Sequence, residues 1–267
     1  MEKIVLPNGY GYFYDTHIHT TAGSACAKST PIEVCEAYKA LGYTGLAFTD
    51  HNWGGNTSID NSLPWPTWVA GFTKGYRTAR KWGEKHDFDV FWGYEAGYDG
   101  TEFLILGLEP EFLLETPALK TASVKEQRQI VKAAGGIVIH AHPFRAASYI
   151  PEIRTFPFDV DAVEGFNSAH NYRFSKASYH QKVTLKKYDT DAVEYALDNG
   201  LPITAGSDSH NAKQLGGGGM AFMRRPESAQ DLAAMIRTGK GYRLTDGIAW
   251  YDEFGKELTK VEYATVS

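Results

Sequence analysis

The stretch YTGLAFTDHN, residues 43–52, is a short apolar run that ends in two metal-ligand-type side chains, Asp50 and His51. Short apolar runs bounded by turn residues are typical of buried strands. Four later runs have the same form: DVFWGYEAGY (89–98, with Glu95), GGIVIHAHPFR (135–145, with His140, His142 and Arg145), AVEGFN (162–167, with Glu164 and Asn167) and LPITAGSDSHN (201–211, with Asp208 and His210). The sequence therefore places candidate ligands at the ends of several predicted strands.

Segments with helical periodicity alternate with these runs. TPIEVCEAYKALG (30–42) has Thr30 as an N-cap, Glu33 completing a capping box and Gly42 as a terminator. SVKEQRQIVKAAGG (123–136) has the same signals, and further helices are predicted across 67–84, 189–199 and 227–238. Alternating strands and helices predict a parallel α/β architecture, whose strand ends meet on one face in a barrel. We expect one domain over residues 1–267.

Two histidines, His17 and His19, are one residue apart in DTHIHTTAGSACA (15–27). On an extended strand this spacing puts both imidazoles on the same face. The pair alone leaves two interpretations open, a metal site and two histidines satisfied by the protein itself.

Composition limits the classes of function. The net charge of −5 and the pI near 6.0 give no electrostatic signature of nucleic-acid or anionic-membrane binding. No apolar run approaches the length of a signal peptide core or a membrane span, which predicts a cytoplasmic protein without a membrane partner. The two cysteines, Cys26 and Cys35, argue against a disulfide framework as the basis of the fold.

The motifs THIHT, FTDHN, GYEAGY, AHPFR and GSDSH, in this order, resemble the PHP (polymerase and histidinol phosphatase) superfamily of metal-dependent phosphoesterases. The resemblance covers residues 12–225 approximately. It implies a distorted (β/α)7 TIM-like barrel with two or three divalent ions at the C-terminal ends of its strands, and hydrolysis of phosphate esters by a metal-activated hydroxide.

Carried over by position, the resemblance implies a set of metal ligands. His17, His19 and Asp208 match a first metal site with Glu95 as the bridging carboxylate, whereas His51, His142 and His210 match ligands of the other ions. Asp50, which ends a strand beside His51, is a further candidate ligand. Mixed imidazole and carboxylate donors suit Zn, Mn or Fe.

Three residues near these motifs depart from the pattern or stand beside it. Glu102 occupies a position where many relatives have histidine, and we keep it as a candidate ligand because a carboxylate can replace imidazole. Cys26 is interpreted as a bystander, and His140 as a packing or ligand-supporting residue rather than a ligand. The number of metal ions is therefore open.

Two residues outside the ligand set are catalytic candidates. Arg145 has the chemistry to grip a phosphate oxygen through two hydrogen bonds, with an ordinary salt-bridged arginine as the alternative. His170, after another strand end, has the chemistry to protonate the leaving oxygen, with a solvated loop histidine as the alternative.

Several segments are predicted to shape the site or its surroundings. Residues 52–68, with three tryptophans, form either a lid or a packed surface loop. Residues 167–188 form a second active-site loop, and Arg173, Lys176, Lys182, Lys186 and Lys187 make it a local phosphate attractor or a solvated helix face. The glycines at 216–219 allow a loop to pass close to the site. Residues 245–267 read as a strand–turn–strand extension.

The sequence thus favours a metal-dependent phosphoesterase acting on a small phosphorylated substrate, with a phosphomonoester as the leading choice. The alternatives are a histidinol-phosphate phosphatase, a nuclease-like phosphodiesterase on a nucleotide or short oligonucleotide, and a non-catalytic metal-bound regulatory module. An amidohydrolase-like enzyme is less favoured, because no lysine stands among the ligand-bearing motifs. The oligomeric state is not predicted.

Overall fold

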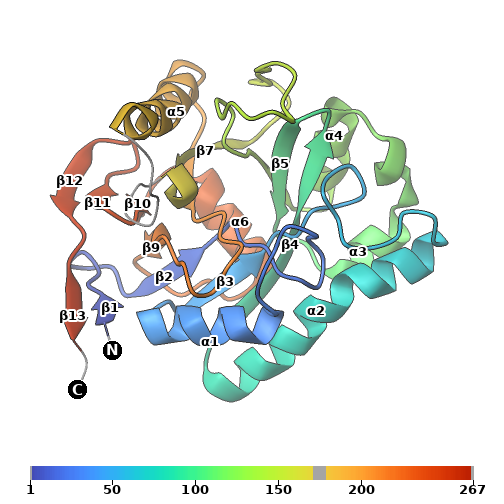
Figure 1. Cartoon of the computed structure of the whole chain (residues 1–267), viewed down its shortest axis with the longest axis horizontal. Coiled ribbons are helices and arrows are strands. Elements are labelled where there is room, and N and C mark those ends of the chain that lie inside the picture. Colours follow the sequence, from blue (N-terminus) through green and yellow to red (C-terminus); the bar gives the residue numbers. More distant parts are fainter. Residues whose placement is uncertain (1, 171–178, 266–267) are drawn as a thin grey trace.

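The computed structural model describes residues 2–170 and 179–265, apart from the side chains of 179–184. The fold is mixed α/β, with helices outside a strongly curled sheet (Figure 1). The helices are α1 (Pro31–Leu41), α2 (Trp65–His86), α3 (Pro110–Glu115), α4 (Val124–Ala133), α5 (Tyr179–Asp198) and α6 (Ala229–Arg237), with 3-10 helices η1 (Pro117–Thr121) and η2 (Ser168–His170).

The central strands are β2 (Tyr12–Asp15), β3 (Gly45–Phe48), β4 (Asp89–Tyr98), β5 (Thr101–Leu106), β6 (Ile137–His140), β7 (Ala162–Asn167) and β8 (Ile203–Gly206). Beside β2 the sheet continues through β9 (Gly218–Phe222), β10 (Tyr242–Asp246), β11 (Ala249–Tyr251) and β12 (Glu257–Lys260). A separate pair, β1 (Glu2–Ile4) and β13 (Tyr263–Thr265), runs antiparallel at the lower left of Figure 1.

The predicted helix signals act as expected. Thr30 and Glu33 form a capping box at the start of α1, and Gly42 ends that helix in the left-handed conformation at φ 98°. Ser123 and Glu126 make the same box at the start of α4. The helix predicted across 189–199 is longer than expected, because α5 already begins at Tyr179. The sequence analysis did not predict the short helix α3.

The sheet corrects the expectation of an all-parallel barrel. β2, β3 and β4 run parallel, and so do β6, β7 and β8, but β5 is antiparallel to both of its neighbours. The reason is a two-residue hairpin turn at Asp99 (φ 47°) and Gly100 (φ 84°), which reverses the chain directly after β4. Asp-Gly is a strong signal for such a turn, because both of its positions need positive φ.

The curled sheet brings β8 back toward β2. Ile18 and Ser209, which follow these two strands, form a parallel bridge, and the Asp208 N–H donates to the carbonyl of His17 at 2.8 Å. The sheet is therefore an open, strongly curled half-barrel, the distorted form of the (β/α)7 barrel that the motifs predict. The C-terminal extension forms the expected antiparallel hairpin from β11 and β12.

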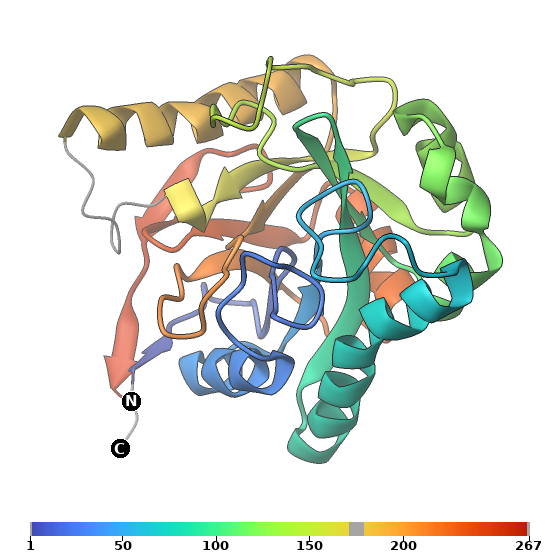
Figure 2. The same ribbon diagram turned by 45° about the vertical axis from the view of Figure 1, so that its right-hand side comes forward.

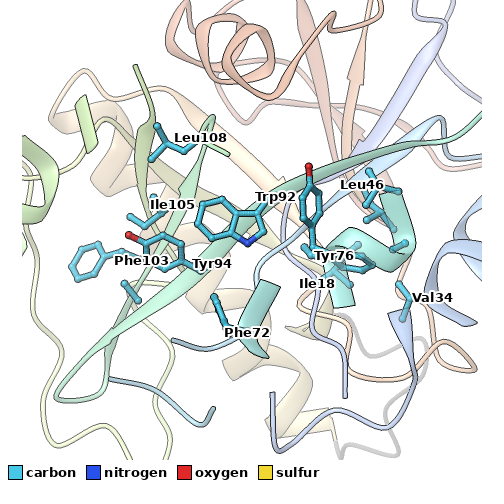
Figure 3. Close-up of a cluster of buried hydrophobic side chains, with 14 of the residues drawn as sticks. Ile18, Val34, Leu46, Phe72, Tyr76, Trp92, Tyr94, Phe103, Ile105 and Leu108 are labelled. Atoms are coloured by element: carbon cyan, nitrogen blue, oxygen red, sulfur yellow. The ribbon is translucent and has the colours of Figure 1, made fainter. Parts of the chain in front are cut away.

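An aromatic-rich core holds α1 and α2 against the sheet. Figure 3 shows Trp92 and Tyr94 from β4 beside Phe72 and Tyr76 from α2, and all four side chains are buried. Phe103 and Ile105 of β5 are also fully buried, so the antiparallel strand belongs to the same core. This rigid packing fixes β4 and β5, which carry two of the predicted ligands. In the described part of the chain, no helix is long and apolar enough to cross a membrane.

Candidate metal centre

The loops after β2, β3 and β8 gather on one side of the sheet (Figure 2). Backbone contacts join them: Ser24 bridges Thr57, and the Lys28 N–H donates to the carbonyl of His210 at 2.7 Å. The side chains brought together there are His17 and His19 after β2, His51 after β3, Glu95 in β4, Glu102 in β5, His142 after β6, and Asp208 and His210 after β8. They come from almost every central strand.

Within the described residues, these side chains form four groups with metal-binding geometry. The groups are His19, His51 and His210; His17, His19 and Asp208; His17, Glu95 and His142; and His51, Glu95 and Glu102. Neighbouring groups share members, so the arrangement is one continuous multi-metal cluster rather than four separate sites. Apart from His210, all of these residues are buried. The structure does not bring the carboxylate of Asp50 into any of these groups.

The spacing of donor atoms in the His17, His19 and Asp208 group fits a cation. His17 Nε2 is 3.1 Å from His19 Nε2 and 3.4 Å from Asp208 Oδ1, and His19 Nε2 is 3.2 Å from the same oxygen. Ligands at metal bonds of ~2 Å in a tetrahedron lie about 3.3 Å from one another. The three atoms therefore lie at the distances that one bound cation requires.

The orientation of His17 is set by Glu164. The Nδ1–H of His17 donates to Glu164 Oε1 at 2.8 Å, which leaves Nε2 without a proton in the neutral ring. Glu164 Oε2 in turn accepts from the His142 N–H at 3.1 Å and from Asn167 Nδ2 at 3.0 Å. Gly206 makes room for this contact, since a Cβ there would lie 2.5 Å from the Cβ of His17. A carboxylate that orients a ligating histidine in this way is common at metal sites.

His19 is oriented by Ser24 and Asp50. The Ser24 hydroxyl donates to Asp50 Oδ1 at 2.7 Å, so it accepts from His19 Nδ1 at 3.0 Å. His19 Nε2 is then also a bare lone pair, and it faces the bare Nε2 of His17. Asp50 further accepts from the N–H and hydroxyl of Thr20 at 2.6 and 2.7 Å. Asp50 thus supports His19 through Ser24, a contact that the strand-end pattern does not predict.

Glu95 stands at the centre of the cluster. Its Oε1 is 3.2 Å from His142 Nε2, and its Oε2 is 2.8 Å from His51 Nδ1. The angle of the contact with His51 is unsuitable for a hydrogen bond, so the buried Nδ1 of His51 makes no hydrogen bond. Burial opposes ionisation of Glu95, but the charges of His17 and His51 hold its pKa well below the usual value.

Other pKa values show how strongly the carboxylates of the cluster attract positive charge. Burial would lower the pKa of His17, yet the carboxylates of Glu164, Asp208 and Glu95 raise it well above the usual value. Burial also opposes a raised pKa at His51, which Glu95 nevertheless raises to about 11. Burial and the charge of Glu95 raise the pKa of Glu102 to about 7. A bound cation would supply the charge that these carboxylates attract.

Two of the candidate ligands have strained backbones. His142 has φ 27° and Asp208 has φ 52°, both in the region that non-glycine residues rarely adopt. Such strain persists only where the surrounding structure enforces it, and it concentrates at functional sites.

Cys26 and His140, which the sequence analysis did not count as ligands, lie in different environments. Cys26 lines the cavity, where hydrogen bonds from His210 and His51 overcome burial and lower the pKa of its thiol to about 6. His140 is fully buried, and its ring stacks on Phe103 at 5.0 Å. Neither ring nitrogen of His140 has a hydrogen-bond partner, so it packs in the core.

A cavity of about 550 Å³ opens beside the cluster. Arg145 lines it, and its Nη2 lies 2.6 Å from Asp208 Oδ2. His170 is only 5% exposed, which excludes the solvated loop histidine. Its Nε2 accepts from Arg145 Nε at 3.0 Å, and its Nδ1 lies 2.7 Å from Asp189 Oδ1. The sequence analysis did not single out Asp189.

The loop over residues 52–68 reaches this cavity through Gly54, Gly55 and Asn56. Its tryptophans face elsewhere: Trp65 and Trp68 stack with ring centroids 5.7 Å apart, and Trp53 packs edge-on against both. The packed-loop interpretation therefore holds for the aromatic residues, while the glycines form a wall of the cavity.

The other predicted loops are described only in part. Arg173 and Lys176 lie outside the described residues, as does the side chain of Lys182. Lys187 pairs with Asp191 on the exposed face of α5. In the glycine run 216–219, a Cβ at Gly216 would lie 2.1 Å from the hydroxyl of Ser168, so close packing against η2 requires glycine there.

Comparisons with known proteins agree with this fold. A family model described as PHP-associated matches residues 190–240. A two-domain protein from Bacteroides vulgatus ATCC 8482 that contains a predicted PHP-like metal-dependent phosphoesterase superposes with a TM-score of 0.64 at 16% identity, covering 91% of this chain and 68% of that chain. PsfC from Pseudomonas syringae PB-5123 superposes with a TM-score of 0.55 at 18% identity, covering 84% of this chain and 88% of its own.

No curated protein matches the chain in sequence. At these identities the structural likeness establishes the fold. The chain therefore has the fold of the PHP superfamily, as its motifs predict. In this chain the fold carries a buried cluster of histidine, glutamate and aspartate side chains whose geometry suits several metal ions.

Proposed function

We propose that this protein is a metal-dependent phosphoesterase that hydrolyses a small phosphomonoester with two or three divalent ions, Zn, Mn or Fe. The observation that carries the proposal is the pair of facing lone pairs on His17 and His19, whose Nε2 atoms lie 3.1 Å apart. Their outer nitrogens are engaged by Glu164 and Ser24, so the two inner atoms need a positive charge between them. In metal-free protein a proton on His17, whose pKa is raised, supplies that charge, and a bound cation would replace the proton.

The proposed ligands can be divided between the ions. His17, His19 and Asp208 would hold one ion, Glu95 would bridge to a second ion, and His51, His142 and His210 would complete the remaining coordination. Glu102 supplies a further carboxylate beside His51 and Glu95. When bound, such ions lower the pKa of a coordinated water and stabilise the attacking and leaving oxygens of an in-line displacement. Asp50 is assigned here to the support of His19 rather than to coordination.

The cavity argues for a small substrate. Its volume of about 550 Å³ suits a compact molecule. Among the described residues that line the cavity, Arg145 is the arginine, and it lies beside the ligand cluster. The guanidinium is suited to bind an oxygen of a phosphate group through two N–H donors. The buried histidines and carboxylates would hold the ions beside the phosphate group, while the glycine wall at Gly54 and Gly55 leaves room for the remainder of the substrate.

The test is release of phosphate by protein loaded with Mn²⁺ or Zn²⁺, measured on phosphomonoesters including histidinol phosphate, on cyclic nucleotides and on short oligonucleotides. We expect turnover of phosphomonoesters that is lost with a chelator and with Asp208→Asn. Asp198→Asn, at an exposed position of α5, is the matched control and should retain activity. Turnover of diesters alone would support the phosphodiesterase alternative. Bound metal without turnover of any ester would support a binding module.

A further inference from the structure

Arg145 and His170 follow neighbouring strands, and Arg145 lines the cavity while His170 lies behind it. Arg145 follows β6, and His170 ends η2 directly after β7. The Nε–H of Arg145 donates to His170 Nε2 at 3.0 Å, and His170 Nδ1 lies 2.7 Å from Asp189 Oδ1 on α5. The three side chains form a continuous chain of hydrogen bonds from a surface helix to the cavity wall.

The arginine determines which nitrogen of His170 carries the proton. A guanidinium has only donors and does not lose its proton in proteins, so His170 Nε2 must accept. The neutral imidazole then carries its proton on Nδ1 and donates it to Asp189. The nitrogen of His170 that contacts Arg145 therefore has no proton to give to a leaving group.

The far end of the arginine lies beside Asp208. Its Nη2 is buried and lies 2.6 Å from Asp208 Oδ2, but no aligned hydrogen bond is made by that nitrogen. The side chain is 16% exposed and lines the cavity. The ion pair with Asp208 leaves this donor without an aligned hydrogen bond, and a phosphate oxygen would supply one.

We propose that Asp189 and His170 are positioning residues that fix the guanidinium of Arg145 for binding a substrate phosphate, and that His170 is not the proton donor. This inference rests on the proposed function, because it assigns the phosphate-binding geometry of that site. It replaces the role that the sequence analysis gave to His170.

The first experiment needs no turnover. Long-range ¹H–¹⁵N correlation spectra of metal-free protein report the imidazole tautomer, and the His170 signals are assigned by their loss in His170→Gln. We expect a neutral ring protonated at Nδ1. A ring protonated at Nε2 would overturn the chain of hydrogen bonds, whether or not the protein hydrolyses phosphate esters.

The second experiment separates positioning from acid catalysis. His170→Gln keeps an acceptor near Nε2 but cannot donate as an acid, whereas His170→Ala removes both functions. We expect His170→Ala to raise KM and the inhibition constant of inorganic phosphate by about tenfold. Both constants should be restored largely in His170→Gln. Equal and severe loss of kcat in both variants would contradict the proposal.

The leaving group gives an independent readout. Loss of a general acid harms alkyl phosphates far more than p-nitrophenyl phosphate, because the aryl leaving group needs no proton. We expect His170→Ala to reduce kcat/KM for both classes by the same factor. A selective loss on alkyl phosphates would restore the acid role.

Asp189 is tested against a neighbour on the same helix. Asp189→Asn should weaken phosphate binding in the same direction as His170→Ala, because a neutral amide oxygen accepts the Nδ1–H of His170 more weakly than a carboxylate and holds the ring less firmly. Asp191→Asn is the control, since Asp191 pairs only with Lys187 at the surface among the contacts described for it. If Asp189→Asn binds inorganic phosphate as tightly as Asp191→Asn in calorimetry of metal-loaded protein, Asp189 has no positioning role. Thermal denaturation of each variant verifies that it is folded.

Discussion

His17 donates its Nδ1–H to Glu164 Oε1 across 2.8 Å, although 147 positions separate the two residues in the chain. This one contact determines which nitrogen of His17 faces the cluster. It also ties the first motif, after β2, to the middle of β7 on the other side of the curled sheet. Both side chains are fully buried, so water does not compete for the bond.

Replacing Glu164 with glutamine tests this contact. The carboxylate accepts from His17 on one oxygen and from His142 N–H and Asn167 on the other, whereas an amide offers one accepting oxygen only. We expect metal affinity to fall by about 10- to 100-fold in Glu164→Gln. Competition with a calibrated chelator measures it, and Glu194→Gln at an exposed site of α5 is the control. Unchanged affinity would mean that Glu164 has no influence on the ligands.

Ser24 is a second supporting residue that should matter for both metal binding and stability. Its hydroxyl accepts from the His51 N–H at 3.0 Å as well as contacting His19 and Asp50. Ser24→Ala leaves buried polar groups without partners, which costs about 1–3 kcal/mol in unfolding free energy. Urea denaturation of metal-free protein measures this loss. The exposed Ser62→Ala is the control, and equal stability of the two variants would contradict the role of Ser24.

The fold was predictable because local signals and the hydrophobic pattern agree. The capping boxes at Thr30 and Ser123 and the apolar run of β4 each specify their element within a few residues. The antiparallel course of β5 was missed, although Asp99–Gly100 carries the turn signal that produces it. The parallel architecture was inferred from the alternation of strand and helix patterns alone, without this turn signal.

The candidate site was predictable only in part, for a different reason. Residues that end buried strands can be found along the sequence, so His51, Glu95 and Asp208 were singled out. Ser24 and Asp189 act through hydrogen bonds that depend on how a loop and a helix fold over those strand ends. Neither lies in an apolar run, and serine and aspartate are common at surfaces, so their sequence context carries no signal.

The two cysteines should react very differently. Hydrogen bonds from His210 and His51 lower the pKa of Cys26 to about 6, while burial raises that of Cys35 to about 12. The thiolate is the reactive form. In metal-free protein at pH 7, we expect iodoacetamide to modify Cys26 and spare Cys35, with a rate that rises with pH through about 6.

Peptide mass spectrometry locates the modification of each cysteine. Metal-loaded protein should react more slowly at Cys26, because ions bound by His51 and His210 withdraw those hydrogen bonds and crowd the thiol. Preferential modification of Cys35 would contradict the environments described for the two thiols.

Metal affinity should rise with pH, because protons and cations compete for the same atoms. The pKa of Glu102 is raised to about 7, so this carboxylate loses its proton over the range from about pH 6 to 8 and becomes a donor as pH rises. His51, with a pKa raised to about 11, must also release a proton when it binds a metal.

Glu102→Gln should therefore flatten the pH dependence between about pH 6 and 8 and reduce the metal content by one ion per chain. Elemental analysis after gel filtration measures the content, and the exposed Glu115→Gln is the control. An unchanged metal content and pH profile would exclude Glu102 as a ligand.

The hairpin between β4 and β5 should be the most sensitive glycine turn near the cavity. Gly100 has φ 84°, and a Cβ there would lie 2.9 Å from the Cα of Ile150. Gly9 has nearly the same φ, 85°, but a Cβ at Gly9 would meet nothing within 4 Å. An alanine at either site would therefore have the same backbone strain of the left-handed region. Only the alanine at position 100 would also collide with a neighbouring residue.

We expect Gly9→Ala to lower the unfolding free energy by about 1 kcal/mol, which is the cost of the strained conformation. Gly100→Ala should lose about 3 kcal/mol, because overpacking against the loop that carries Tyr149 and Ile150 is added. Denaturant titration gives both values. Because Tyr149 lines the cavity, Gly100→Ala should also change KM for the substrate, whereas Gly9→Ala should not. Equal losses of stability would show that the loop yields to the added methyl group, and that the hairpin does not fix the position of Tyr149.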